Sequence, residues 1–362
     1  MGERQQQQQL RCLIAAGGTV GHVAPSLAVA EALRGRGVEV TFAGSPDRVE
    51  ARLVPERGYA FDAFRVAGFP RRPGPRLLGA LWLAAAAPAA CLRILAKRRP
   101  DVVLGGGGYV AGPMVLAAWL RRIPAALTEA DAMLGLSNRL ATPFVRRVFV
   151  AYPVADGRDG KVSVVGRPIP SSSRAVPRDE ARRQLGLAEE GPLVLVFGGS
   201  LGARTLNETA VAAWGEAGPD VLHLCGERDW SELRGRVSRP GYTLLPFVDA
   251  FGAALGAADL VVSRAGGSVW EIAAAGRPAI LVPYPAATAD HQNRNAEYFE
   301  RAGGAAIVDD ASARTAVPRL VDELLADPVR LGEMAEAMRA AAKPDAADRI
   351  ADELVELAAA RR

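Results

Sequence analysis

A histidine that follows a glycine-rich turn is the first side chain in this sequence able to transfer a proton near neutral pH. The turn Gly17-Gly18-Thr19-Val20-Gly21 leads into His22, and it follows the apolar run Leu10 to Ala16, which is typical of a buried strand. Because the ordinary pKa of imidazole is close to neutral, His22 suits the role of a general base. The other interpretation is that His22 only caps or supports the turn.

A carboxylate stands beside a similar turn between Asp259 and Asn295. Leu260 to Ser263 predicts a strand, Arg264-Ala265-Gly266-Gly267 a tight turn, and Ser268 the start of a helix that carries Glu271. The free amides and the dipole of a helix N-terminus favour an anion at such a place. Since Ser268-x-x-Glu271 also has the form of a capping box, Glu271 has both a ligand-binding and a structural interpretation.

Two further glycine turns follow predicted strands. They are Gly105-Gly106-Gly107-Gly108, which leads into Tyr109, and Gly198-Gly199-Ser200-Leu201-Gly202. Four consecutive glycines lose much backbone entropy on folding, and core packing does not explain them, so we expect a ligand to approach the main chain there. With the polar loop Asp290-His291-Gln292-Asn293, the turns predict a pocket for a nucleotide-linked sugar.

The turns belong to repeated strand–turn–helix units, which predict parallel-sheet α/β domains. After the first turn we expect a helix over Pro25 to Arg34 and a second strand over Val38 to Ala43. The first turn is not G-x-G-x-x-G, and the second strand does not end in the acid that a dinucleotide-binding fold needs. The sequence therefore disfavours a dehydrogenase.

The pattern begins twice, as GGTVGH and as GGSLGA, so the 362 residues predict two domains. We expect a disordered leader over 1–9, an N-terminal domain over 10–166 and a proline- and serine-rich linker over 167–173. A C-terminal domain over 174–344 follows, and then a helix over 345–362 that packs back on the N-terminal domain.

Composition excludes several classes of protein. A net charge of +4 without a dense basic stripe argues against a nucleic-acid partner. The three cysteines are far apart and show no metal-binding spacing, which favours a reducing cytosol. The chain has no Asp-x-Asp pair, so we expect no metal and no cofactor. Helix amides, with Arg264 or Arg167 nearby, would then stabilise a departing diphosphate.

The segment Leu77 to Leu92 is the most apolar of the chain. It is shorter than the roughly 20 residues of a membrane-spanning helix, and Pro88 is expected to interrupt it. Basic residues flank it over the region Arg71 to Arg99. The region is either a core-facing helix with solvated ends or a patch that binds an anionic membrane surface.

In combination the motifs GGTVGHVAPSLAVAEAL, GGGGYVAGP, GGSLGARTLN and SRAGGSVWEIAAAGRP resemble the MurG family of bacterial peptidoglycan synthesis. The resemblance implies two Rossmann-like domains that face each other across a cleft, the GT-B glycosyltransferase fold. It implies inverting transfer of N-acetylglucosamine from UDP-N-acetylglucosamine to the 4-hydroxyl of lipid I (undecaprenyl-pyrophosphoryl-MurNAc-pentapeptide), which forms lipid II. It also implies a peripheral location on the cytoplasmic face of the cell membrane and leaves room for partners among other cell-wall synthesis proteins.

The resemblance assigns roles to particular residues. His22 matches the family's histidine, and Gly105 to Tyr109 its acceptor and diphosphate loop. Ser200 matches a serine beside the diphosphate, and Val248 an apolar residue whose backbone meets uracil. The substrate-binding set that the resemblance implies is Thr19, Val20, Gly21, Asp131, Arg167, Ser200, Val248, Gly267, Ser268, Glu271, His291 and Gln292. In this set Glu271 grips the ribose diol and Gln292 reads the sugar hydroxyls.

The chain departs from the family pattern at several positions. Asp131 stands for an asparagine, and Thr128 for a histidine, in a His-Glu-Gln-Asn pattern. Pro170 falls where many members carry a phosphate-facing arginine, and Arg167 is the candidate to replace it. His291 replaces the first of two glutamines.

Two other functions stay open at this point. One is another GT-B enzyme that uses a UDP-sugar, either a soluble-acceptor glycosyltransferase or an epimerase. The other is a non-catalytic scaffold that binds a sugar nucleotide. Substitution of His22 or Glu271 by alanine separates the classes, because an enzyme loses turnover and a scaffold loses at most affinity.

Overall fold

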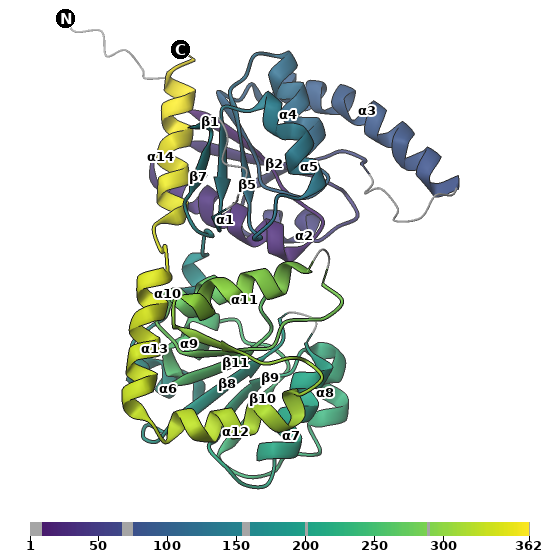
Figure 1. Cartoon of the computed structure of the whole chain (residues 1–362). Coiled ribbons are helices and arrows are strands. Elements are labelled where there is room, and N and C mark those ends of the chain that lie inside the picture. Colours follow the sequence, from purple (N-terminus) through teal and green to yellow (C-terminus); the bar gives the residue numbers. More distant parts are fainter. Residues whose placement is uncertain (1–8, 67–74, 154–159, 200–201, 288–289, 362) are drawn as a thin grey trace, which may run out of the picture. The chain divides into compact units, whose positions relative to one another are not determined.

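A computed structural model of the chain describes residues 9–66, 75–153, 160–199, 202–287 and 290–361 (Figure 1). The chain divides into two compact units, one made of Met1–Pro170 and Pro344–Arg362 and the other of Ser171–Lys343. The division falls inside the segment 167–173. Of the leader expected over 1–9, all but Gln9 lies outside the described residues.

Unit 1 is built on seven parallel strands in the order β3-β2-β1-β4-β5-β6-β7. Its strands are β1 (Arg11–Ala15), β2 (Glu39–Gly44), β3 (Ala60–Ala63), β4 (Val102–Gly105), β5 (Ala125–Glu129), β6 (Arg147–Val150) and β7 (Val162–Val164). Its helices are α1 (Val20–Gly35), α2 (Glu50–Glu56), α3 (Pro75–Arg98), α4 (Ala111–Leu120), α5 (Leu136–Ala141) and α14 (Ala346–Ala359).

Helices cover both faces of this sheet, because its central strands are apolar on both sides. One core joins the sheet to α3 and α4, through residues such as Cys91 and Met114. The other core joins it to α1, α2 and α14, through residues such as Leu33 and Leu354 (Figure 1). The last helix of the chain is therefore part of the core of unit 1, and Arg36 fixes it further by pairing with Asp348 and Asp352.

Unit 2 repeats the architecture with six parallel strands in the order β10-β9-β8-β11-β12-β13. Its strands are β8 (Leu193–Phe197), β9 (Asp220–Leu224), β10 (Tyr242–Leu245), β11 (Leu260–Ser263), β12 (Ala279–Leu281) and β13 (Ala305–Ile307). Its helices are α6 (Arg178–Leu185), α7 (Arg204–Trp214), α8 (Glu227–Leu233), α9 (Phe251–Ala257), α10 (Val269–Ala274), α11 (His291–Arg301), α12 (Ala313–Leu325) and α13 (Pro328–Ala341).

The expected fold class of two parallel-sheet α/β domains is confirmed. In each unit the strand order reverses direction once, between β1 and β4 and between β8 and β11. Ligands of open parallel sheets bind beyond the carboxyl ends of the strands at such a reversal. All four glycine turns of the sequence follow these four strands, so each unit places two of them at its reversal point.

The apolar segment around Pro88 differs from its prediction. Helix α3 is 24 residues long in total, and it continues through Pro88 instead of breaking there. A proline removes one helical hydrogen bond, and the burial of Ala87, Cys91 and Leu95 in the core compensates for that loss. No helix in the described part of the chain is long and apolar enough to cross a membrane.

Candidate functional site

The first glycine turn of unit 1 leads into a helix that starts earlier than predicted. Helix α1 begins at Val20, not at Pro25, so His22 lies in its first turn. Pro25 has no N–H to donate to the carbonyl of Gly21, four residues earlier. Arg167 Nη2 donates to that carbonyl instead, at 2.7 Å, and thereby satisfies the acceptor that the proline leaves open.

His22 is half-buried and lies against the main chain of the tetraglycine turn. A Cβ at Gly107 would come within 2.6 Å of His22 Nδ1. Burial lowers the pKa of His22 below its ordinary value, Asp131 acts to raise it, and Arg167 lowers it. The imidazole is therefore neutral at pH 7, the state in which it can accept a proton.

The tetraglycine turn has a different cause from the one expected. A Cβ at Gly106 would lie 2.1 Å from Ser26 Oγ, and one at Gly108 would lie 2.2 Å from the carbonyl oxygen of Gly17. The prediction that core packing does not explain these glycines was therefore wrong. The close approach that they permit is between the two turns of unit 1, and Tyr109 adds to it by lying against Gly18.

Glu50 is a residue of this region that sequence reasoning missed. Its side chain is fully buried, and Oε2 accepts a hydrogen bond from the N–H of Gly18 at 3.0 Å. Oε1 accepts from the N–H of Ser45 at 3.0 Å, so one carboxylate ties the turn after β1 to the end of β2. Sequence reasoning looked for an acid directly after the second strand. It missed Glu50, because Glu50 lies six residues beyond the end of β2.

A second buried carboxylate organises the loop after β5. Glu129 Oε1 accepts from the N–H of Ala130 at 3.0 Å, and Oε2 accepts from the N–H of Gly135 and from Asn138 Nδ2. Burial raises the pKa of Glu129, although the hydrogen bonds act in the opposite direction. Arg167 Nη1 also holds this loop through the carbonyl of Ala130, which places Asp131 near His22.

In unit 2, the turn after β11 is held by residues that reach it from other elements. Arg264 is buried, and its Nη1 donates to the carbonyls of Val282 and Pro283 and pairs with Asp310. Asn295, from α11, donates to the carbonyl of Ala265 at 3.2 Å. Arg264 and Arg167, the two cations expected near a diphosphate, are thus both buried and bonded to main-chain carbonyls.

The expected capping box at the start of α10 does not form. Ser268 has helical backbone angles, with φ −65° and ψ −10°, and its side chain makes no capping hydrogen bond. A capping side chain normally reaches the helix amides from an extended backbone. Glu271 lies half-buried in the first turn of α10, close in sequence to Gly267.

The polar segment expected as a loop is the start of a helix. His291 and Gln292 lie in the first turn of α11, and Gln292 Oε1 accepts from the N–H of Tyr284 at 2.8 Å. The carbonyl of this amide is thus used to hold the loop after β12. Val248 is half-buried in the segment that follows β10. Ser200 lies outside the described residues.

The turn after β8 combines closely packed glycines with an open one. Gly202, with φ +72°, would bring a Cβ within 2.2 Å of the carbonyl of Cys225, whereas Gly199 has a φ of +88° and open space around it. Asn207 Nδ2 donates to the same Cys225 carbonyl, and Asn207 Oδ1 lies 3.0 Å from His223 Nε2. Burial lowers the pKa of His223 to about 3, so it is a neutral structural histidine.

The three expected substrate-binding residues of the first turn lie at the carboxyl edge of the sheet in unit 1. Thr19, Val20 and Gly21 are exposed there, next to His22. The structure thus brings one half of the expected site together in unit 1, and Gly267, Ser268 and Glu271 together in unit 2. Among the described residues, no group of three or more His, Cys, Asp or Glu side chains gathers in a way that could hold a metal ion.

Comparison with known proteins identifies the family. The glycosyltransferase family 28 N-terminal domain matches residues 12–150, and the C-terminal domain of the same family matches residues 193–350. This chain is a member of glycosyltransferase family 28. A UDP-N-acetylglucosamine--N-acetylmuramyl-(pentapeptide) pyrophosphoryl-undecaprenol N-acetylglucosamine transferase of Acidithiobacillus ferrooxidans is 42% identical to this family 28 chain, with 96% of the chain and 97% of the relative covered. A transferase of the same name from Halothermothrix orenii is 37% identical, over 92% and 95%.

Solved structures agree with this family 28 assignment. The crystal structure of Acinetobacter baumannii MurG superposes with a TM-score of 0.77 at 29% identity, and covers 96% of this chain and 99% of that one. A UDP-GlcNAc 2-epimerase from Neisseria meningitidis shares the fold alone, with a TM-score of 0.65 at 12% identity over 96% of this chain and 100% of that one. The family 28 chain is therefore a glycosyltransferase with the GT-B fold.

The contacts of Glu50 lead to a prediction about the first glycine turn. Substitution Glu50→Ala leaves the buried N–H groups of Gly18 and Ser45 without an acceptor. We expect a loss of about 2 kcal/mol or more in the free energy of unfolding and a fall in kcat of at least about tenfold, because the turn that carries His22 loosens. Denaturant unfolding and steady-state kinetics measure both effects.

Glu56→Ala is the matched control, because Glu56 ends the same helix, is exposed and pairs only with Arg52 among the described residues. A Glu50→Ala protein with the stability and kcat of this control would contradict the role of Glu50.

Proposed function

We propose that this chain transfers N-acetylglucosamine from UDP-N-acetylglucosamine to the 4-hydroxyl of the muramoyl sugar of lipid I, with inversion, and so forms lipid II. Membership of the family of the named transferases supports the reaction. The observation in the structure that carries the proposal is the place of His22, which lies in the first turn of α1 against Gly107, next to the Gly21 carbonyl that Arg167 holds. Through lipid II, a precursor of peptidoglycan, the reaction serves cell shape and division.

In this proposal His22 is the catalytic base. Its neutral imidazole takes the proton of the acceptor hydroxyl while the hydroxyl oxygen bonds to the anomeric carbon and the UDP oxygen departs. Asp131 lies close enough to His22 to act on its charge, so the imidazolium that forms has a carboxylate near it. The acceptor loop over Gly105 to Tyr109 acts indirectly, because its glycines hold His22 in place.

Unit 2 binds the donor in this proposal. Glu271 accepts from the ribose hydroxyls, and Gln292 offers its amide N–H groups to the sugar because its carbonyl already holds Tyr284. The main chain at Gly199 and Gly266 meets open space, which supports close approach of the diphosphate. The amides at the start of α7 then stabilise the departing UDP. The other expected donor contacts stay with the proposal: Thr19, Val20, Gly21, Arg167, Ser200, Val248, Gly267, Ser268 and His291.

An activity assay tests the function directly. Purified chain, incubated with UDP-N-acetylglucosamine and a lipid I analogue, should release UDP at an unchanged rate when a chelator such as EDTA is added, because amide dipoles take the place of a divalent ion. His22→Ala should lower kcat by about a hundredfold or more, in the range of a lost general base. Glu271→Ala should raise the KM for the donor.

UDP release without the lipid analogue at the same rate would point to another reaction. No release at any concentration of the analogue would defeat the proposal, and a requirement for magnesium would defeat the amide mechanism. Unchanged turnover in His22→Ala would contradict the role of His22 as the base, but it would not contradict the transferase reaction.

The environment of His22 predicts the pH dependence of the reaction. A general base works when it is deprotonated, so kcat/KM should fall as the pH drops through the pKa of His22. Because that pKa is lowered, the acid limb should lie below pH 6.5. Asp131 acts to raise this pKa, so Asp131→Asn should move the acid limb to a still lower pH. A limb above pH 6.5, or one that does not move in the variant, would contradict the assignment.

We further propose a peripheral location on an anionic membrane surface, through a patch on unit 1. The region expected for this role, Arg71 to Arg99, only partly supports it: Arg71 and Arg72 lie outside the described residues, and Lys97 and Arg98 both pair with Asp62. A better candidate is the α4–α5 surface, defined by the exposed side chains Trp119, Leu120, Leu136 and Leu140.

The α4–α5 surface has the character of an interfacial patch. Trp119 packs edge-on against Phe144, with ring centroids 5.2 Å apart, and still exposes 52% of its surface. Exposed cations adjoin these residues in sequence, with Arg121 and Arg122 after Leu120 and Arg139 before Leu140. Aromatic and aliphatic side chains rimmed by arginine suit the headgroup region of an anionic bilayer.

Vesicle sedimentation tests this location. The double substitution Trp119→Ser and Leu140→Ser should weaken binding to phosphatidylglycerol vesicles by about tenfold or more, because it removes apolar area that the bilayer would bury. Val329→Ser is the matched control, since Val329 is an exposed apolar residue of unit 2. Equal binding by the double variant and the control would reject the patch.

A further inference from the structure

A cavity of unit 1 lies at the end of the sheet opposite the glycine turns. It measures about 520 Å³ and is lined where α3 ends, where β4 begins and just before β5. All strands of this sheet are parallel, so β4 and β5 begin at the amino end of the sheet. The glycine turns lie at its carboxyl end. The cavity therefore belongs to neither half of the proposed transferase site.

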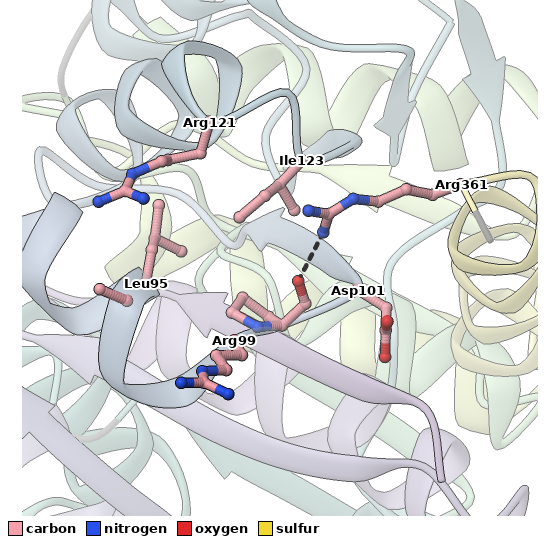
Figure 2. A pocket seen from close by; sticks show the side chains of 8 residues that line it. Leu95, Arg99, Asp101, Arg121, Ile123 and Arg361 are labelled. Atoms are coloured by element: carbon pink, nitrogen blue, oxygen red, sulfur yellow. Dashed lines mark hydrogen bonds between the residues drawn. The ribbon is translucent and has the colours of Figure 1, made fainter. Parts of the chain in front are cut away.

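Three arginines from three different elements line this cavity. Figure 2 shows Arg99 after α3, Arg121 after α4 and Arg361 after α14, with Leu95 and Ile123 between them. Arg361 Nη1 donates to the carbonyl of Pro100 at 2.8 Å, which fixes this guanidinium in the wall of the cavity.

The cavity has an excess of positive charge. Its one lining carboxylate, Asp101, accepts a hydrogen bond from the N–H of Arg11 at 2.9 Å. None of the three lining arginines forms an ion pair with a carboxylate in the part of the chain that the structure describes. Nearby cations behave differently, because Lys97 and Arg98 share Asp62.

An adjoining cavity extends the site. It measures about 620 Å³, shares Ile123 and Arg361 with the first, and has the apolar side chains of Trp119, Phe144 and Leu357 in its wall. Three more cations line it: Arg122, Arg146 and Lys161. Guanidinium groups that outnumber the carboxylates around a concave, partly apolar space suit the charge and the hydrogen-bonding capacity of a phosphate group.

We propose that the cavity lined by Arg99, Arg121 and Arg361 is a binding site for a phosphate-bearing ligand, separate from the site of transfer. The shared chemistry is a phosphate monoester, diester or diphosphate, and it comes either from a soluble compound or from the headgroup of an anionic lipid. Arg99 and Arg121 supply free guanidinium donors, and Arg361 orients toward the space through its bond to Pro100. Binding weakens as salt rises, because the attraction is electrostatic.

The test uses the full chain with saturating UDP, so that the nucleotide site is occupied. Calorimetric titration with inorganic pyrophosphate at low salt probes a soluble ligand, and sedimentation with phosphatidylglycerol against phosphatidylcholine vesicles probes a headgroup. We expect Arg99→Ala with Arg121→Ala to weaken binding of at least one probe by about a hundredfold, or about tenfold for each charge-assisted contact. Loss with pyrophosphate alone indicates a soluble ligand. Loss with phosphatidylglycerol vesicles alone indicates a lipid in the cavity if Arg99→Ala by itself shares it; a loss that Arg99→Ala does not share belongs to the α4–α5 surface and counts against the cavity.

Arg349→Ala is the matched control, because Arg349 is an exposed arginine on α14, the helix that Arg361 follows, and lines neither cavity. Arg121→Glu, a single exposed change at the end of α4, serves if the double variant does not fold. The proposal is overturned if the variants bind both probes as tightly as the unmodified chain, or if Arg349→Ala loses as much affinity as they do.

Discussion

The hydrogen bond from Arg167 to the carbonyl of Gly21 determines how unit 1 presents its chemistry. Helix α1 can begin at Val20 with a proline in its second turn only because another donor takes the carbonyl that Pro25 leaves open. The same guanidinium holds the carbonyl of Ala130, so the first turn of α1 and the loop after β5 are fixed together. His22 thereby acquires both a cation and a carboxylate as neighbours, and burial keeps it neutral between them.

The two units share one topology but use glycine for different purposes. In unit 1, Gly106, Gly107 and Gly108 are needed because the protein's own atoms fill the space that a side chain would occupy. In unit 2, Gly199 and Gly266 border open space. The glycines of unit 1 therefore allow close packing that holds a histidine in place, whereas those of unit 2 leave the main chain accessible. This difference fits a division between a catalytic group in unit 1 and a donor-binding surface in unit 2.

Much of the fold could be predicted because its signals are local. Buried parallel strands are continuous apolar runs, and the strand at 260–263 has the predicted bounds. Predictions were wrong where a residue that is distant in sequence determines the local structure. The start of α1 depends on Arg167, 142 residues beyond Pro25 in the chain, and a capping pattern at Ser268 says nothing of the backbone angles that make capping possible.

The parts of the site that sequence reasoning missed are buried carboxylates and amides that face the main chain. Glu50, Glu129 and Asn295 each satisfy backbone groups of a glycine turn or of a loop beside it. Such residues follow no periodic pattern that would reveal them, and the main-chain groups that they bind are present at nearly every position of a chain. Their positions become visible only when the strand order brings the loops to one edge.

The basic residues at the end of α3 show how the fold sorts charges that are adjacent in sequence. Lys97, Arg98 and Arg99 form one run, yet Asp62 on β3 takes the first two. Arg99 has a left-handed backbone, with φ +47°, directly after the helix ends, and it lines the cavity instead. A basic run therefore does not define a basic surface: the uncompensated charge of this region is assembled from the ends of α3, α4 and α14, which the sequence keeps more than 20 residues apart.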